Sequence, residues 1–141
     1  MVRIRCPIFP TESPELVRQA VESILGGTDI RQSTNGEKTY MMGSMQGRDN
    51  LNLLRQAIHD KRIIDAVRSR LMKNWEVSTS FLRFDKQAAF KGRTRLVDDA
   101  AETPPLGSIL LEVSFDKSES EFNQFMNWFV PPTQDGRVVK P

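Results

Sequence analysis

The chain has 141 residues, of which 38% are hydrophobic and 27% are charged, and its formal net charge is +2 at pH 7. No apolar run approaches the ~20 residues that a membrane span requires, so the composition excludes a membrane-spanning protein and is typical of a globular domain. The only cysteine, Cys6, excludes an internal disulfide, and the only histidine, His59, excludes a metal site with several histidine ligands. Because the first residues also contain no apolar run of signal-peptide length, we expect a cytoplasmic protein.

The charge is unevenly distributed along the chain. Residues 1–97 contain 17 Lys and Arg against 10 Asp and Glu, whereas residues 98–141 contain 3 against 8. Such an asymmetry creates a positive and a negative region. Either the positive region faces a polyanion such as nucleic acid, or the two regions attract each other within the fold.

The first two elements have clear signals. Residues 2–9 alternate between apolar and mostly basic side chains, which predicts a half-buried strand with Cys6 among the buried residues. Ser13 and Pro14 are typical of a helix start, and Gly26-Gly27 is typical of a helix end, so a helix is expected between them. Cys6 should therefore be buried and unreactive.

A hairpin and two helices are expected next. Residues 29–34 and 38–45 flank Asn35-Gly36, a pair that favours a type I′ turn. Apolar side chains at helical spacing then predict two helices, over residues 51–58 and 63–75. The second helix also carries a basic face, which is either solvated or in contact with a polyanion. The cations of that face are Lys61, Arg62, Arg68, Arg70 and Lys73.

Two strands, near residues 77–84 and 89–97, are expected to follow, and they form the predicted binding surface. In the second strand Lys91, Arg93 and Arg95 recur at every second residue, so all three would project from one face of the sheet, opposite Phe90 and Leu96. Two further cations lie close to them in the sequence. The candidate nucleic-acid-binding residues are therefore Arg83, Lys86, Lys91, Arg93 and Arg95.

The rest of the chain reads as a loop over residues 98–106, a strand over 108–115 and a helix that ends before Pro131-Pro132. The predicted order is β-α-β-β-α-α-β-β-β-α. Grouped strands with hairpin-like connections favour the α+β class, with helices packed on one face of a mostly antiparallel sheet. We expect a single domain over residues 1–132 and a mobile tail over 133–141.

Four segments together resemble a known family. They are V-R-I-R-C-P-I-F-P-T-E near the start of the chain, I-I-D-A-V-R at 63–68, F-D-K-Q-A-A-F-K-G at 84–92 and P-L-G-S-I from residue 105. The chain resembles a family of small, functionally uncharacterised archaeal proteins with an RNA-binding label, whose fold is similar to that of large-subunit ribosomal protein number five. Asp85 departs from the asparagine that we expect at that position. The resemblance implies this fold and an RNA-binding role, and it carries over no catalytic residue.

The sequence shows no constellation of nucleophile, base and orienting group. Asp98, Asp99 and Glu102 form the best carboxylate cluster, but they lie in a predicted loop, where solvated acids are the usual case. His59 lies at a helix end among charged residues. We therefore expect no enzymatic activity, no metal and no small-molecule cofactor.

The leading hypothesis is an RNA-binding module, because the planar guanidinium of arginine matches phosphate oxygens. Phe90 is expected on the face opposite the cations, and Phe81 and Phe84 cannot share a face. We therefore expect salt-sensitive phosphate contacts with little sequence specificity. The alternative is a protein-interaction module or homodimer that pairs through the open sheet face, with Leu82 and Leu110 supplying apolar area.

Overall fold

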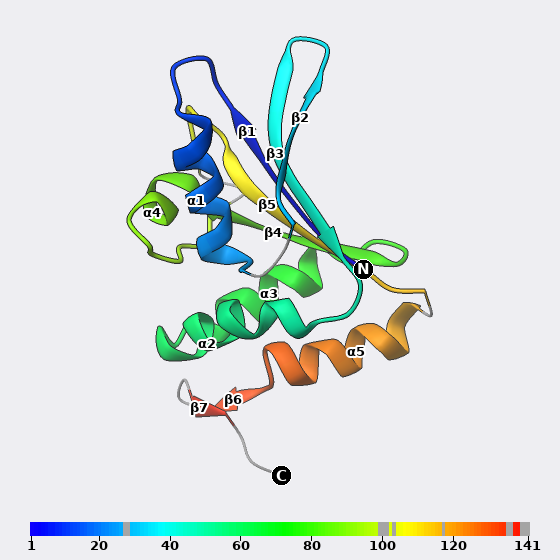
Figure 1. The fold of residues 1–141 in the computed structure, drawn as a ribbon. Helices are drawn as coiled ribbons and strands as arrows, with labels where there is room; N and C mark the ends of the chain where they lie inside the picture. Colours follow the sequence, from blue (N-terminus) through cyan, green and yellow to red (C-terminus); the bar gives the residue numbers. More distant parts are fainter. Residues whose placement is uncertain (27–28, 99–101, 103, 117, 135–136, 139–141) are drawn as a thin grey trace.

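The central sheet contains five antiparallel strands. Along the chain they are β1 (Val2–Ile8), β2 (Arg31–Asn35), β3 (Lys38–Met45), β4 (Thr79–Asp85) and β5 (Ser108–Ser114). In space their order is β2-β3-β1-β5-β4 (Figure 1). The computed structural model describes residues 1–26, 29–98, 102, 104–116, 118–134 and 137–138.

The helices lie on one face of this sheet (Figure 1). They are α1 (Pro14–Ile24), the 3-10 turn η1 (Asp49–Leu51), α2 (Asn52–Asp60), α3 (Ile64–Lys73), α4 (Lys86–Phe90) and α5 (Ser118–Phe129). Within the described residues no helix covers the other face, which we call the open face. The α+β class and the antiparallel sheet with helices on one face, both expected from the sequence, are confirmed.

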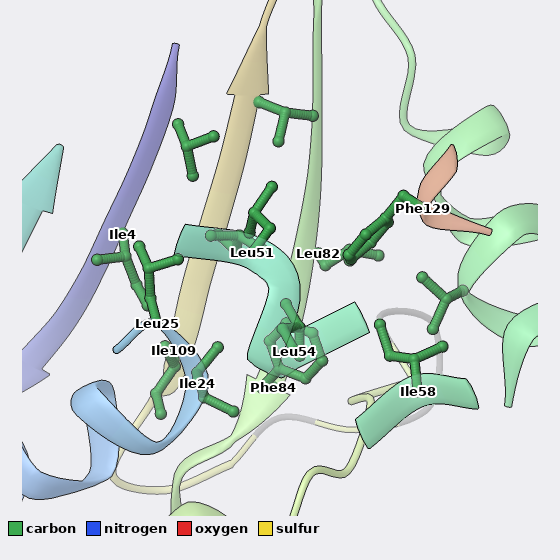
Figure 2. Packing of buried hydrophobic residues seen from close by; sticks show 14 of the residues in the cluster. Ile4, Ile24, Leu25, Leu51, Leu54, Ile58, Leu82, Phe84, Ile109 and Phe129 are labelled. Carbon is green, nitrogen blue, oxygen red and sulfur yellow. The ribbon is translucent and has the colours of Figure 1, made fainter. Parts of the chain in front are cut away.

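Alternation along the strands separates the two faces. In β1, Val2, Ile4 and Cys6 are buried while Arg3 and Arg5 are exposed. Because successive side chains of a strand point to opposite faces, the buried set faces the helices and the arginines project from the open face. Figure 2 shows apolar side chains of β1, β4 and β5 meeting those of α1 and α2, among them Ile4, Phe84, Ile109, Ile24 and Leu54.

The signals for the first helix and for the hairpin are confirmed, with one change in the turn. Ser13 caps α1, since its Oγ accepts a hydrogen bond from the amide of Leu16, and Pro14 is the first helical residue. In the hairpin, Asn35 pairs with Lys38, so the two central residues of the turn are Gly36 and Glu37. Of these only Gly36 has a positive φ, 66°. This sign pattern fits a type II′ turn and not the expected type I′.

The predicted strand over residues 89–97 is wrong. Residues 86–90 form α4, which Asp85 caps by accepting a hydrogen bond at Oδ1 from the amide of Gln87. Gly92, with a φ of 70°, follows the helix in the left-handed conformation that commonly ends helices. Only Leu96 forms a β-bridge, with Phe84, so the segment touches the edge of β4 without continuing as a strand.

A short hairpin of β6 (Thr133–Gln134) and β7 (Arg137–Val138) follows α5. The hydroxyl of Thr133 donates a hydrogen bond to the Asp65 carboxylate on α3. Residues 135–136 and 139–141 lie outside the described residues, so the mobile tail stays a prediction, as does the single-domain boundary at 132. Among the described helices, none combines the length and apolar character needed to cross a membrane.

Candidate nucleic-acid interface

Lys86, one of the five predicted cations, is buried, with 1% of its side chain exposed. Its Nζ donates to the carbonyls of Pro7 and Leu106, at 2.6 and 2.8 Å, and to Oε1 of Glu12 at 2.8 Å. An ammonium has three donors, and here all three are used. Lys86 therefore joins the chain before α1, the start of α4 and the loop before β5, and it offers no donor to a phosphate.

Arg95 is engaged by two carboxylates. Its guanidinium contacts Oδ2 of Asp85 at 3.2 Å and both carboxylate oxygens of Glu102 at 2.8 Å. The Asp98 amide and the Arg95 guanidinium both stabilise the charged form of Glu102 and hold the pKa of that carboxyl below its usual value. The best carboxylate cluster of the sequence is thus partly an ion pair with Arg95. Asp99, its third member, lies outside the described residues.

Lys91 and Arg93 are exposed but lie on the helical side of the molecule. They follow α4, which packs against α1. Lys61 at the end of α2 donates to the carbonyl of Thr94 at 3.3 Å, which ties the same segment to the helices. Arg83 projects from the open face, because it alternates on β4 with the buried Leu82 and Phe84. The structure therefore does not bring the predicted set together.

The open face carries a different set of arginines, which the strand register places in one row. Five residues, one from each strand, pair across the sheet in this order: Arg31 lies opposite Met42, Met42 opposite Arg5, Arg5 opposite Leu110 and Leu110 opposite Arg83. Directly paired residues share a face, so all five project from the same side. Since neighbouring strands lie about 4.8 Å apart, an arginine recurs in this row roughly every 10 Å.

A shallow hollow of about 660 Å³ lies over the part of this row that runs from Arg31 to Leu110. It is lined by Arg3, Arg5, Asp29, Arg31, Met42 and Glu112, among others. Arg3 lies 3.9 Å from Glu112, and Arg31 lies 2.7 Å from Asp29. Hydrogen bonding from Arg31 lowers the pKa of the Asp29 carboxyl. Within the described residues Arg5 forms no ion pair with a carboxylate.

Two aromatic rings accompany the row. The Cζ atom of Arg5 lies 5.1 Å from the centre of the Tyr40 ring, and that of Arg83 lies 5.7 Å from the centre of the Phe81 ring. Both rings are half-buried. Phe84, by contrast, is fully buried, so Phe81 and Phe84 lie on opposite faces as expected. Of the two, Phe81 lies on the open face, beside Arg83.

The sequence could not reveal this surface as one segment, because its residues come from separate strands. Each strand contributes one or two residues, and only the pairing register brings them together. The one local signal was the alternation at Arg3 and Arg5, which indicates that both arginines lie opposite the buried side of β1.

The basic faces of α2 and α3 have a structural role. Arg55 and Arg68 donate to the carbonyls of Trp128 and Val130, each at 2.8 Å, and Nε2 of His59 lies 2.9 Å from the carbonyl of Phe129. Together they satisfy carbonyls at the end of α5, which have no partner within the helix. Arg70 donates to the carbonyl of Val97 at 2.6 Å.

The two apolar residues that were expected to support assembly lie on opposite faces of the sheet. Leu82 is 1% exposed and belongs to the core, so it supplies no area to the open face, and that expectation is wrong. Leu110 is half-buried and lies in the row between Arg5 and Arg83. Within the described part of the chain, no three His, Cys, Asp or Glu residues are placed to hold a metal ion.

Comparison with known proteins identifies the family. A family model described as RNA binding matches residues 1–115. A UPF0201 protein of Pyrobaculum arsenaticum is 33% identical over 138 residues, covering 97% of this chain and 93% of that protein. The chain belongs to the UPF0201 family. It also matches a UPF0200/UPF0201 protein of Archaeoglobus fulgidus at 30% identity, but it spans only 40% of the length of that relative.

Solved structures of the family show the same fold. The 2.2 Å crystal structure of a UPF0201 protein from Methanococcus jannaschii superposes with a TM-score of 0.82 over 99% of this chain and 98% of that one, at 21% identity. A second crystal structure, of an uncharacterized UPF0201 protein, gives a TM-score of 0.75 at 27% identity, with 98% of each chain covered. The expected likeness to ribosomal protein number five stays a prediction.

Proposed function

We propose that this protein is a non-catalytic RNA-binding module whose open face contacts RNA phosphates. The observation that carries the proposal is the row of Arg31, Arg5 and Arg83 across the open face, which none of the described helices covers; Arg31 and Arg5 also line the shallow hollow. The family description, RNA binding, supports the ligand class. A cytoplasmic location, where RNA is accessible, is part of the proposal.

Arginine suits this role because its guanidinium can give two parallel hydrogen bonds to phosphate oxygens. A strand of RNA that crosses the sheet perpendicular to its strands would meet an arginine roughly every 10 Å. Arg3 lies beside the row and adds a fourth cation. Of the residues expected from the sequence, Arg83 is retained in this site, and Lys86 is left out because its three donors are already used.

The test compares two pairs of exposed cations with equal charge. Arg5→Ser/Arg83→Ser changes the open face, and Lys91→Ser/Arg93→Ser changes the helical side. For single strands the salt slope is about −0.7 per phosphate contact, so the first variant should flatten the slope of log K against log salt by roughly 1.4. The second variant should match the parent protein.

The measurement is RNA affinity across a salt series, with circular dichroism as a folding control. An equal slope in the parent and the Arg5/Arg83 variant would contradict the proposed face. A flattened slope in the Lys91/Arg93 variant alone would move the interface to the helical side. A parent protein that binds no RNA at low salt would remove the function itself.

Self-association through the same face is the competing outcome. Met42 is 39% exposed and lies in the row with Leu110, so the face offers some apolar area. A dimer seen by light scattering that dissociates in Leu110→Asp, in a protein that does not bind RNA, would support this alternative.

A further inference from the structure

Both arginine–aromatic pairs of the open face belong to the arginine row. The Arg5–Tyr40 and Arg83–Phe81 pairs have separations of 5.1 and 5.7 Å between guanidinium carbon and ring centre. Each pair offers two flat groups at one place on the face. Arg5 and Arg83 are separated in the row by Leu110 alone, so these two positions lie roughly 10 Å apart. Tyr40 lies on β3, level with Pro7, and Phe81 lies on β4, level with Arg3, so the two rings lie on opposite sides of the two arginines.

Flat groups of this kind are suited to unpaired bases. Every base has a π-face, and bases of single-stranded RNA stack on aromatic rings and on arginine guanidinium planes. In a duplex, neighbouring base pairs cover these faces, and proteins contact the phosphates and 2′-hydroxyls instead. The rings of Tyr40 and Phe81 would therefore find no stacking partner on double-stranded RNA.

The charged residues that line the hollow also favour a single strand over a duplex. Glu112 lies directly opposite Arg3 on one side and Phe81 on the other, in the middle of the face. A carboxylate there repels a phosphate but can accept a hydrogen bond from a base amino group. The face is thus suited to a strand that places phosphates at the arginines and bases between them, and not to a continuous track of phosphates.

We propose that the open face binds single-stranded RNA and stacks unpaired bases on the Arg5–Tyr40 and Arg83–Phe81 pairs. This inference rests on the RNA-binding function proposed above and adds the class of RNA and the groups that hold its bases. It also replaces the expectation of phosphate contacts alone.

The test uses a fluorescently labelled 12-nucleotide oligouridylate, alone and annealed to oligoadenylate, at one salt concentration. The parent protein should bind the single strand at least tenfold more tightly than the duplex. Tyr40→Leu/Phe81→Leu removes both flat rings and keeps apolar side chains in their place. Each lost stacking contact should weaken single-strand binding by roughly 5- to 150-fold. The salt slope should not change, because no phosphate contact is lost.

Phe90→Leu is the matched control, since Phe90 is a 37% exposed aromatic residue on the helical side. It should bind like the parent protein. A second readout uses the parent protein itself: an oligouridylate with one 2-aminopurine base should lose fluorescence when that base stacks on a ring. This arm keeps the test informative if the double variant folds poorly.

The outcomes separate this inference from the function on which it rests. Equal affinity for single strand and duplex, or a Tyr40/Phe81 variant that binds like the Phe90 control, would overturn base stacking while RNA binding stands. Unchanged 2-aminopurine fluorescence on saturation would also overturn it. If the parent binds neither RNA form, the proposed function fails and base stacking fails with it.

Discussion

The helical side and the open face of the sheet both carry arginines, but the groups around those arginines differ. On the helical side, Arg55 and Arg68 donate to backbone carbonyls at the end of α5. On the open face, Arg5 and Arg83 lie over aromatic rings. The sequence alone does not distinguish these two sets of arginines. Their contacts do: the first set stabilises the end of a helix, and the second set lies on the face that we propose binds RNA.

Backbone chemistry explains the difference. The last carbonyls of a helix have no partner within the helix, and they attract cations that pack nearby. The carbonyls of an inner strand such as β1 already accept hydrogen bonds from the neighbouring strands, so an arginine that projects from it finds no backbone acceptor. Arg5, which projects from β1 over the Tyr40 ring, therefore differs from Arg55 and Arg68, whose donors are used by carbonyls at the end of α5.

The largest loss of stability is expected when Lys86, a cation of the helical side, is replaced. Replacing it with Met would leave the Glu12 carboxylate buried, with 7% of that side chain exposed and with Oε2 already lacking a hydrogen-bond partner among the described residues. Breaking a buried ion pair from one side costs about 3–5 kcal/mol. We expect a loss of that size in the free energy of unfolding, measured by urea denaturation.

The control for Lys86→Met is Lys91→Met, which removes an exposed cation five residues away and should change stability little. The double variant Lys86→Met/Glu12→Gln removes the buried charge as well and should recover part of the loss. A Lys86→Met protein as stable as Lys91→Met would show that the buried pair does not hold the three segments together.

A smaller effect is expected from the cations at the end of α5. Arg68→Met removes the donor to the carbonyl of Val130 while keeping much of the apolar stem. Hydrogen bonds that involve a charged group contribute about 1.5–3 kcal/mol, so unfolding should become easier by roughly that amount. Lys73→Met, at an exposed position of the same helix, is the matched control for urea denaturation. Equal stability of the two variants would mean that Arg68 is as dispensable as a solvated surface cation.

Elements with a local signal could be predicted from the sequence. The alternation in residues 2–9, the Ser13-Pro14 start of α1 and the turn near Gly36 were all recognised, and each lies where it was expected. The strand predicted over residues 89–97 is wrong because Lys91, Arg93 and Arg95 alternate with other residues as they would in a strand. Asp85 is a good helix cap, however, and the residues after it favour a helix, so α4 forms in place of the start of that strand.

The candidate site was less predictable, for a physical reason. A stripe along one strand can be read from consecutive residues, whereas a row across strands depends on register, which a single sequence does not display. Arg83 was found because it lies near other cations in the sequence. Arg31 and Tyr40 were missed as site residues because the hairpin places them beside β1 only after the sheet forms.

The smallest effect concerns Cys6, which follows Arg5 on β1 and points the opposite way, into the core. Burial raises the pKa of its thiol from 9.0 to about 12, partly offset by the nearby charge of Lys86. Above pH 9 the unfolded chain therefore loses this proton while the native protein keeps it, so the unfolded state binds fewer protons and stability falls as the pH rises. Since one pKa unit corresponds to about 1.4 kcal/mol, we expect this group to reduce stability by roughly 1.4 kcal/mol at pH 10 relative to pH 8. Cys6→Ala lacks the titrating group and shares all the others, so its stability should fall less steeply over this range.

At pH 8 a thiol reagent should label the native protein far more slowly than the urea-unfolded chain. Parallel pH curves for the two proteins, or rapid labelling of the native thiol, would show that this side of β1 is not sealed from water and that the two faces of the sheet differ less than their side chains indicate.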